Sequence, residues 1–226
     1  MIVAIHQPNY LPYLGFFDKI KQSDIFVIYD DAQFNKEDFQ HRNKIRIYHG
    51  WKYLTIPVVK KNIQIKDIKI RNEFIIKSLT WQEAHLKDIR DNYIDAPYYD
   101  LYCKQLETIY TNKYNKLIDL NMDIINFLMV AFEIKKKIIL SSELGFTSKS
   151  TQRLADITES LGGDVYLSGP AGRNYLDVSI FESKGINVDF QDFRHPIYKQ
   201  CYDGFISNMS AIDALFNLSE MPRIKE

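Results

Sequence analysis

A histidine and two aspartates stand where apolar runs end near the start of the chain. Residues 1–5 form a short run rich in β-branched side chains that ends at His6, and residues 25–29 form a second run that ends in Asp30 and Asp31. Imidazole and carboxylate groups are the side chains that most often move protons in catalysis. His6 and Asp30 are therefore candidate catalytic bases.

Both apolar runs are too short for helices, and their β-branched residues predict buried strands. Between them, Pro8 and Pro12 interrupt regular pairing, and a helical face begins after Gly15. A strand, loop, helix and strand in this order predict two parallel strands. Their carboxyl ends would bring His6 and the two aspartates to one edge of the sheet, which is where open α/β sheets bind ligands.

A second group of candidate residues follows the apolar run at 165–167, which predicts another buried strand. Its small residues and a proline would let backbone N–H groups approach an anion or a carbonyl group, and its arginine and asparagine offer planar donors. An ordinary tight turn is the alternative interpretation. The residues assigned to substrate binding here are Ser168, Gly169, Arg173, Asn174 and Tyr175.

His195 is a third candidate base, because the ring of Pro196 holds it in extended backbone and gives its side chain a defined direction. Tyr198 and Gln200 follow it as predicted substrate-binding residues.

The segment 33–46 is the most polar region near the predicted edge. Its amide and cationic groups could hold a diphosphate or stabilise a carbonyl oxyanion. A loop clamp that bonds backbone groups is the alternative. The predicted binding residues are Gln33, Arg42, Asn43 and Lys44, together with Gln7, Asn9, Tyr10 and Gly15 of the first loop.

The remaining pattern predicts an α/β, Rossmann-like (HUP-type) fold with a mainly parallel sheet and helices on both faces. Further strands are expected at 138–140 and 186–190, and helices at 151–161 and 209–218. Residues 73–137 change to helical periodicity and predict a helical insertion or subdomain within a single domain spanning 1–226. Basic residues alternate with isoleucine over 60–72, which favours a half-buried strand pair, or one strand with a bulge, whose basic side chains are solvated rather than forming a phosphate-facing strip.

Composition limits the class of protein. The 226 residues are 46% apolar, enough to bury a core, and 29 basic residues balance 29 acidic ones, which argues against a general nucleic-acid or membrane surface. Cys103 and Cys201 form neither a disulfide framework nor a zinc-ligand spacing, so no metal is predicted. Without a secretory leader or a long apolar run, a cytoplasmic protein is expected, with no DNA partner and no membrane insertion.

Several motifs together resemble one family. The stretches HQPNYLPYLGFFDKI, FQHRNKI, VYLSGPAGRNYLD, HPIYKQ and SAIDALFN are similar to the WbqC-like family, which is encoded in bacterial O-antigen and capsule gene clusters. The resemblance covers essentially the whole chain. It implies cytoplasmic work on nucleotide-linked sugars for lipopolysaccharide and related polymers, often modified amino sugars, including transfer of an aminoacyl group such as glycine to a 4-amino-4,6-dideoxy sugar.

The run IFVIYDDAQFNKEDFQHR also resembles the second strand and following loop of pantothenate synthetase, an adenylate-forming amide ligase of the HUP-type class. That resemblance implies an ATP site after the first strand. Such enzymes carry an HxGH signature there, whereas this chain has PYLGF.

These observations lead to a hypothesis: an acyl or aminoacyl transferase or ligase that forms an amide on an amino-sugar nucleotide. Nucleotidyl or adenylyl transfer on the same fold is one alternative, and a non-catalytic sugar-nucleotide-binding protein is another. The cofactor stays open between ATP and an activated acyl or aminoacyl donor, with aminoacyl-tRNA among the candidate donors. The oligomeric state is not predicted.

Overall fold

The computed structural model describes residues 1–59, 62–218 and 220–222. The chain divides into two compact units, each assembled from separate stretches of sequence. The first contains residues 1–7, 15–32 and 135–194, and the second contains residues 8–14, 33–134 and 195–226. Whether the chain is a single domain stays a prediction, and the units are described separately below.

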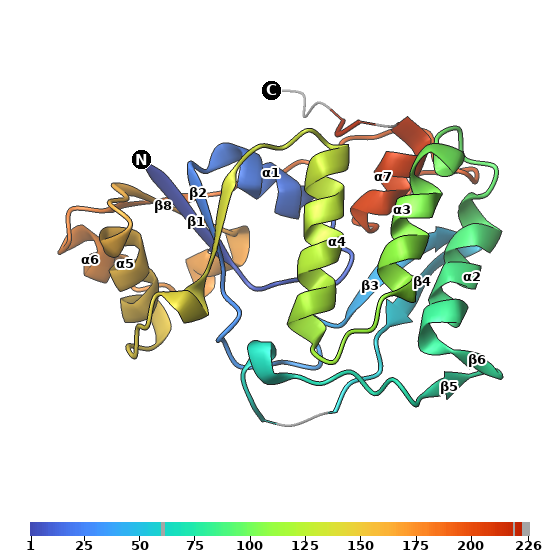
Figure 1. Cartoon of the computed structure of the whole chain (residues 1–226). Helices are drawn as coiled ribbons and strands as arrows, with labels where there is room; N and C mark the ends of the chain where they lie inside the picture. The colour runs from blue at the N-terminus through green and yellow to red at the C-terminus, as the bar shows by residue number, and fades with distance from the viewer. Residues whose placement is uncertain (60–61, 219, 223–226) are drawn as a thin grey trace. The chain divides into compact units, whose positions relative to one another are not determined.

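The first unit is built on a five-stranded parallel sheet (Figure 1). Its strand order is β7-β2-β1-β8-β9. The strands are β1 (Ile2–His6), β2 (Ile25–Ile28), β7 (Lys137–Leu140), β8 (Val165–Ser168) and β9 (Asn187–Phe190). These strands confirm the sequence prediction within one or two residues.

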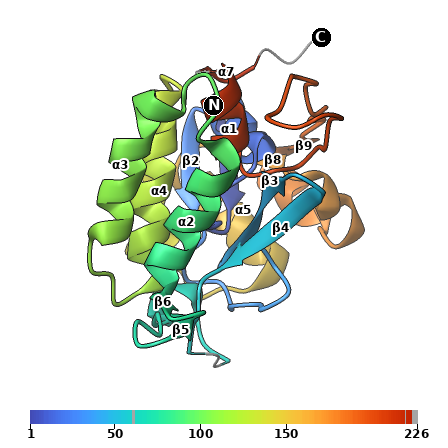
Figure 2. The same cartoon turned by 90° about the vertical axis from the view of Figure 1, so that its right-hand side faces the viewer.

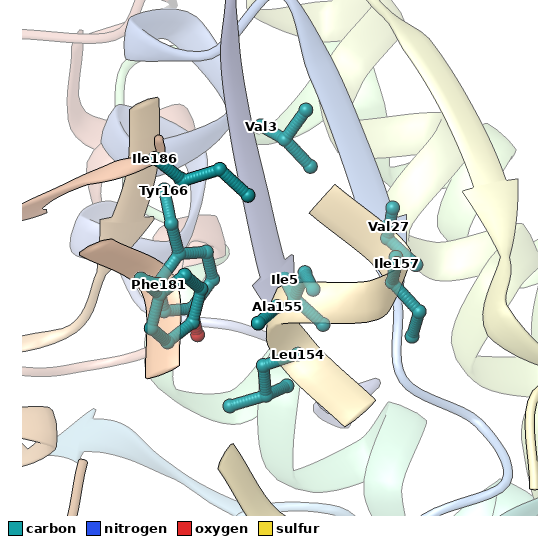
Figure 3. Close-up of a cluster of buried hydrophobic side chains, with 9 residues drawn as sticks. All are labelled: Val3, Ile5, Val27, Leu154, Ala155, Ile157, Tyr166, Phe181 and Ile186. Carbon is teal, nitrogen blue, oxygen red and sulfur yellow. The ribbon is translucent and has the colours of Figure 1, made fainter. Parts of the chain in front are cut away.

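Helices cover both faces of this sheet because successive strand residues point to opposite sides. Val3 and Ile5 of β1 pack against α5 (Ser150–Ser160) in a cluster that also includes Phe181 of α6 (Val178–Glu182) (Figure 3). Phe16 of α1 (Leu14–Gln22) makes edge contacts with His6 and Phe26 on the other face. The predicted Rossmann-like α/β fold is thereby confirmed.

Gly163 is a point of close approach between β1 and α5. A Cβ added there would lie 2.7 Å from Val3 Cγ2 and 2.8 Å from Thr158 Cγ2. We expect Gly163→Ala to lower the free energy of unfolding by about 1–3 kcal/mol, because neither buried side chain can move aside freely. Urea unfolding measures the loss. Gly169→Ala is the control, since its Cβ would meet nothing within 4 Å. Equal effects of the two substitutions would contradict the packing argument.

The second unit combines helices with a two-stranded antiparallel ribbon. The ribbon pairs β3 (Arg42–Ile47) with β4 (Gly50–Thr55), and β5 (Ile75–Ile76) pairs with β6 (Leu79–Thr80) (Figure 2). A capping box between Thr80 and Glu83 begins the first helix. The helices are α2 (Trp81–Tyr93), α3 (Tyr99–Thr111), α4 (Leu117–Ala131) and α7 (Ala211–Leu218). The predicted helical segment 73–137 thus contains α2, α3 and α4.

One prediction of local structure was wrong in this unit. In the described residues after 60, the alternating stretch forms neither a strand pair nor a bulged strand. It contains a 3₁₀ turn at Ile65–Asp67, and its backbone N–H and C=O groups bond to several separated segments, including Phe34 and Asn115. No single neighbouring strand runs alongside it, so alternation of side chains does not produce a ladder. Lys60 and Lys61 lie outside the described residues.

Among the described ranges, no helix is long and apolar enough to cross a membrane.

Candidate functional site

The order of the strands in the first unit defines where a ligand site is expected. From β1 the chain builds β2 and β7 on one side of the sheet, and later β8 and β9 on the other. The direction of winding therefore reverses between β1 and β8. In open parallel sheets, ligands bind outside the carboxyl ends of the strands at such a point.

Pairing between the two central strands stops before either strand ends. The last β1–β8 pair is Ala4 with Leu167, whereas β1 still pairs with β2 at His6 and Ile28. Beyond Ala4 and Leu167, the ends of β1 and β8 are free of each other's hydrogen bonds. His6 lies at this position.

The His6 imidazole is neutral and held in one tautomer. Nδ1 lies 2.9 Å from the carbonyl oxygen of Gln7, which can only accept, so Nδ1 carries the proton. Burial, reinforced by the positive charge of Lys19, lowers the pKa of His6 to about 4. The ring also makes an edge contact with Phe16, at 5.1 Å between centroids. At neutral pH, Nε2 therefore has a lone pair that can accept a proton.

Lys19 is a residue of this site that the sequence analysis missed. Its ammonium donates to the Ile5 carbonyl oxygen at 2.9 Å, and the residue is only 2% exposed. Burial lowers its pKa to about 7. The sequence pattern could have predicted its burial. Lys19 lies three residues after Phe16 and next to Ile20, on the face of α1 that the apolar residues place against the sheet.

Asp30 and Asp31 do follow β2 at the same edge, as predicted, but their carboxylates are engaged by neighbours. Asp30 accepts from the Ser141 hydroxyl at 3.0 Å, and from the Ser142 amide at 2.9 Å and hydroxyl at 2.6 Å. Asp31 accepts from Ser141 and forms a buried ion pair with Arg153. These contacts lie toward β7, the strand on the far side of β2 from β1. The role of Asp30 as a base stays a prediction.

The loop after β8 presents its donors to solvent. Ser168 is buried and donates to the Gly169 carbonyl oxygen at 3.1 Å, while the Arg173 guanidinium lies 4.2 Å from the centre of the Phe190 ring. A Cβ on Gly172 would lie 2.0 Å from Ser168 Oγ, so the turn requires glycine there. The exposed residues of this loop are Pro170, Ala171, Arg173, Asn174 and Tyr175.

At the start of α1, the Gly15 carbonyl oxygen accepts from Gln191 Nε2 at 2.9 Å. The same amide nitrogen donates to Asp18 at 2.6 Å. Gln191 follows β9, so its side chain ties the edge of the sheet to the first turns of α1.

Several predicted binding residues belong to the second unit and support its loops. Tyr10 is fully buried, and its hydroxyl bonds to His85 Nδ1 at 2.9 Å and to Tyr110. Asn43 Nδ2 donates to the Leu11 carbonyl oxygen at 2.7 Å, and Leu11 has a φ of 44°, which a non-glycine residue rarely adopts. This contact of Asn43 fits the alternative interpretation, in which the side chain holds a loop by bonding a backbone group.

The other predicted residues of this unit are also in contact with protein groups. Arg42 donates to the Glu37 carbonyl oxygen at 2.6 Å, and the Lys44 ammonium lies 4.5 Å from the centre of the Trp51 ring. Gln33 donates to the Asn62 side chain. Asn9 is buried.

The carboxylate of Asp213 organises the residues around His195. It is fully buried, and it accepts from Tyr93 at 2.9 Å, Tyr198 at 2.7 Å and Gln200 at 3.0 Å. Burial raises the pKa of Asp213. Nδ1 of His195 donates to the Pro196 carbonyl oxygen at 2.9 Å, and burial lowers the pKa of this histidine. Assignment of Tyr198 and Gln200 to substrate stays a prediction, since both already satisfy a buried acid.

Of the predicted site residues, the first unit contains His6, Gln7, Gly15, Asp30, Ser168, Gly169, Arg173, Asn174 and Tyr175, of which His6, Asp30 and Ser168 lie at or just after the carboxyl ends of β1, β2 and β8. The second unit holds Asn9, Tyr10, Gln33, Arg42, Asn43, Lys44, His195, Tyr198 and Gln200.

The fold and this edge define an α/β protein of the Rossmann-like class, with polar groups collected where the winding of its sheet reverses. The chain belongs to the WbqC-like protein family, whose model matches residues 7–223. The resemblance carried by the sequence motifs is thereby confirmed.

A curated relative covers nearly the full length. The chain is 33% identical over 218 residues to the uncharacterized protein Rv1507c of Mycobacterium tuberculosis (strain ATCC 25618 / H37Rv), which spans 96% of this chain and 93% of the relative. No solved structure matches the chain.

Proposed function

We propose that this protein is an enzyme that forms an amide on a nucleotide-linked amino sugar, by transfer or ligation of an acyl or aminoacyl group, in bacterial surface-polysaccharide synthesis. Membership in the WbqC-like family supports a polysaccharide-associated role. The cytoplasm, where sugar nucleotides are made, is the proposed location.

The neutral His6 at the end of β1 is the observation that carries the proposal. When an amine attacks a carbonyl carbon, the nitrogen becomes positively charged and must lose a proton before the leaving group departs. Nε2 of His6 is unprotonated at neutral pH, and the Gln7 carbonyl holds the ring in the required tautomer. His6 can therefore accept this proton, as a weak base because its pKa is low.

The loop after β8 supports the other requirement of the reaction. Negative charge develops on the carbonyl oxygen in the transition state, and backbone N–H groups or guanidinium donors stabilise it. In the proposed mechanism, the backbone N–H of Gly169 or the exposed Arg173 guanidinium supplies these donors.

His6→Asn tests the proposal. Asparagine retains an amide that can donate to the Gln7 carbonyl, but it has no basic nitrogen, so we expect turnover to fall about 10²–10⁴-fold. The assay is mass spectrometry of dTDP- and UDP-linked amino sugars offered glycine with ATP, or acyl-CoA donors, in separate reactions. A mass gain in one reaction identifies both the activity and its donor.

His49→Asn is the matched control, because His49 is an exposed histidine in the β3–β4 turn. We expect it to retain wild-type turnover. Full activity of His6→Asn would remove His6 from the mechanism.

A non-catalytic sugar-nucleotide-binding role is the second candidate. The observation that favours it is the engagement of Asp30, Tyr198 and Gln200 by internal hydrogen bonds, which occupies three of the groups predicted for catalysis or substrate binding. Absence of a mass gain in every reaction, together with a rise in melting temperature caused by a sugar nucleotide, would favour this role.

A further inference from the structure

The β3–β4 ribbon has one face that packs inside the second unit. Side chains alternate across a strand, so Asn43, Ile45 and Leu54 lie on the same side of the ribbon, and all three are buried. Lys52 lies on this side as well, where it forms an ion pair with Asp88 of α2 at 2.6 Å. The side of the ribbon that faces α2 is therefore its inner face (Figure 2).

The outer face of the ribbon carries cations and aromatic rings and has no aliphatic side chain. Its residues are Arg42, Lys44, Arg46, Trp51, Tyr53 and Thr55. The Lys44 ammonium lies 4.5 Å from the centre of the Trp51 ring and 5.8 Å from the centre of the Tyr53 ring. The Arg42 guanidinium lies 4.9 Å from the centre of the same tyrosine ring. These are cation–π contacts, and they hold the rings and charges side by side.

Two large rings of the ribbon remain in contact with solvent. Trp51 is 45% exposed, whereas Trp81, the other tryptophan of the chain, is 1% exposed. Tyr48, in the turn that joins the strands, is 69% exposed, and its ring makes an edge contact with the ring of Tyr202 at 5.5 Å. Folding removes most such surface from water, so neighbouring exposed rings indicate a surface that binds a ligand.

Of the cations on the outer face, Lys44 is the one available to a ligand. Arg46 is 3% exposed and donates to the carbonyl oxygens of Gly50 and Asp203, so it holds the turn together. In the described residues, the ion pairs of the ribbon join Arg42 to Glu37 on the outer face and Lys52 to Asp88 on the inner face. Lys44 takes part in neither.

Flat rings beside an unpaired ammonium favour a ligand that has flat apolar groups and negative charge. A neutral sugar can stack on the rings but gains nothing from the ammonium, and an amino sugar is itself a cation. Single-stranded nucleic acid has both features, and proteins bind it by stacking its bases on aromatic side chains next to positive charge. The balanced net charge of the chain argues against a general nucleic-acid surface, but a short single strand requires only a local one.

We infer that the outer face of the β3–β4 ribbon binds the single-stranded 3′ end of an RNA, with bases stacked on Trp51 and Tyr48 and a phosphate held by Lys44. The preference for a single-stranded nucleic acid rests on the ribbon. The choice of RNA rests on the proposed function, because aminoacyl-tRNA, one of the candidate donors, carries its aminoacyl group on such an end.

Binding of two labelled RNA hairpins, measured by fluorescence anisotropy, tests the inference. One hairpin ends in an unpaired ACCA tail at its 3′ end, and the other is blunt. The blunt hairpin should bind about 5–150-fold more weakly, because it offers no base for stacking. The tailed hairpin should also quench the tryptophan emission of the protein. Trp51→Tyr should abolish this quenching and retain binding, since Trp81 is buried.

Two substitutions separate stacking from charge. Trp51→Ala should weaken binding of the tailed hairpin by about 5–150-fold without changing its dependence on salt. Lys44→Met should weaken binding and reduce the slope of log K against log salt concentration by about 0.7, the value for one phosphate contact with a single strand.

The matched controls lie outside the ribbon. Phe74 is 40% exposed and has the Arg71 guanidinium 5.4 Å from the centre of its ring, so Phe74→Ala also removes an exposed ring beside a cation. Lys104→Met removes an exposed lysine of α3. Both variants should bind the tailed hairpin as the wild type does.

Equal binding of the two hairpins, unchanged affinity in Trp51→Ala, or no RNA binding by the wild type would overturn the inference; the last result would leave a protein partner as the occupant of the exposed rings. The proposed function fails separately. RNA binding that depends on Trp51, without amide product from any donor, would leave this RNA site standing and remove the enzyme activity. Amide formation by a protein that binds neither hairpin would do the opposite.

Discussion

Replacing Lys19 with methionine is expected to remove most of the rise in the free energy of unfolding between pH 7 and pH 9. Burial lowers the pKa of this lysine from 10.5 to about 7. Between these two values the unfolded chain binds a proton that the native protein does not, so stability increases as the pH rises. One such proton corresponds to a slope of about 1.4 kcal/mol per pH unit.

Urea unfolding followed by circular dichroism at pH 7, 8 and 9 measures this slope. The range ends at pH 9 because tyrosines begin to titrate above it. The absolute stability of Lys19→Met combines two opposing changes: removal of a buried charge and loss of the donor to the Ile5 carbonyl. The slope is therefore the measurement that decides. Lys21→Met is the control and should keep the wild-type slope; equal slopes in all three proteins would contradict the burial of Lys19.

Asp31→Asn is expected to lower the free energy of unfolding by about 3–5 kcal/mol, because the guanidinium of Arg153 would stay buried without its carboxylate. The side chains of Asp31 and Arg153 are 6% and 10% exposed, so water screens the pair little. The guanidinium lies 5.4 Å from the centre of the Tyr29 ring, and its Nε has no hydrogen-bond partner in the described structure. The Asp31 carboxylate is therefore the group that mainly offsets the cost of burying the Arg153 guanidinium.

A double-mutant cycle isolates this pair. Arg153→Met together with Asp31→Asn should cost less than the sum of the two single substitutions, since neither buried charge remains alone. Asp192→Asn is a surface control, because Asp192 and Arg194 are each 80% exposed, and it should leave the unfolding midpoint unchanged. Additive losses in the cycle would show that Asp31 and Arg153 are not coupled.

Local sequence patterns predicted most of the first unit because each pattern there has a single interpretation. The runs ending at His6 and Asp30 are short and β-branched, and the gap between them holds a loop and one amphipathic helix. Parallel pairing follows from that order. The isoleucine–lysine alternation around Ile65 and Ile68 wrongly predicted strand structure. The backbone contacts of this stretch come from several distant segments, which alternation cannot reveal.

The candidate site was predicted less completely, for a different reason. His6 could be predicted because it follows a buried strand, whereas Lys19 looked like one of many lysines and only its place on the apolar face of α1 distinguished it. Tyr198 and Gln200 looked like binding residues near His195. Their hydrogen bonds to Asp213 depend on α7, which contributes that acid from a separate stretch of the chain.

By itself, the sequence determined the family, the parallel α/β sheet and the positions at which its strands end, because these depend on residue types over short distances. Only the tertiary structure decided the protonation of His6 and Lys19 and the partners of Asp30 and Asp31. Those properties depend on the removal of water by neighbouring elements and on donors that arrive from β7 and α5. The spacing of residues along the chain reveals neither the removal of water nor the donors that arrive from distant elements.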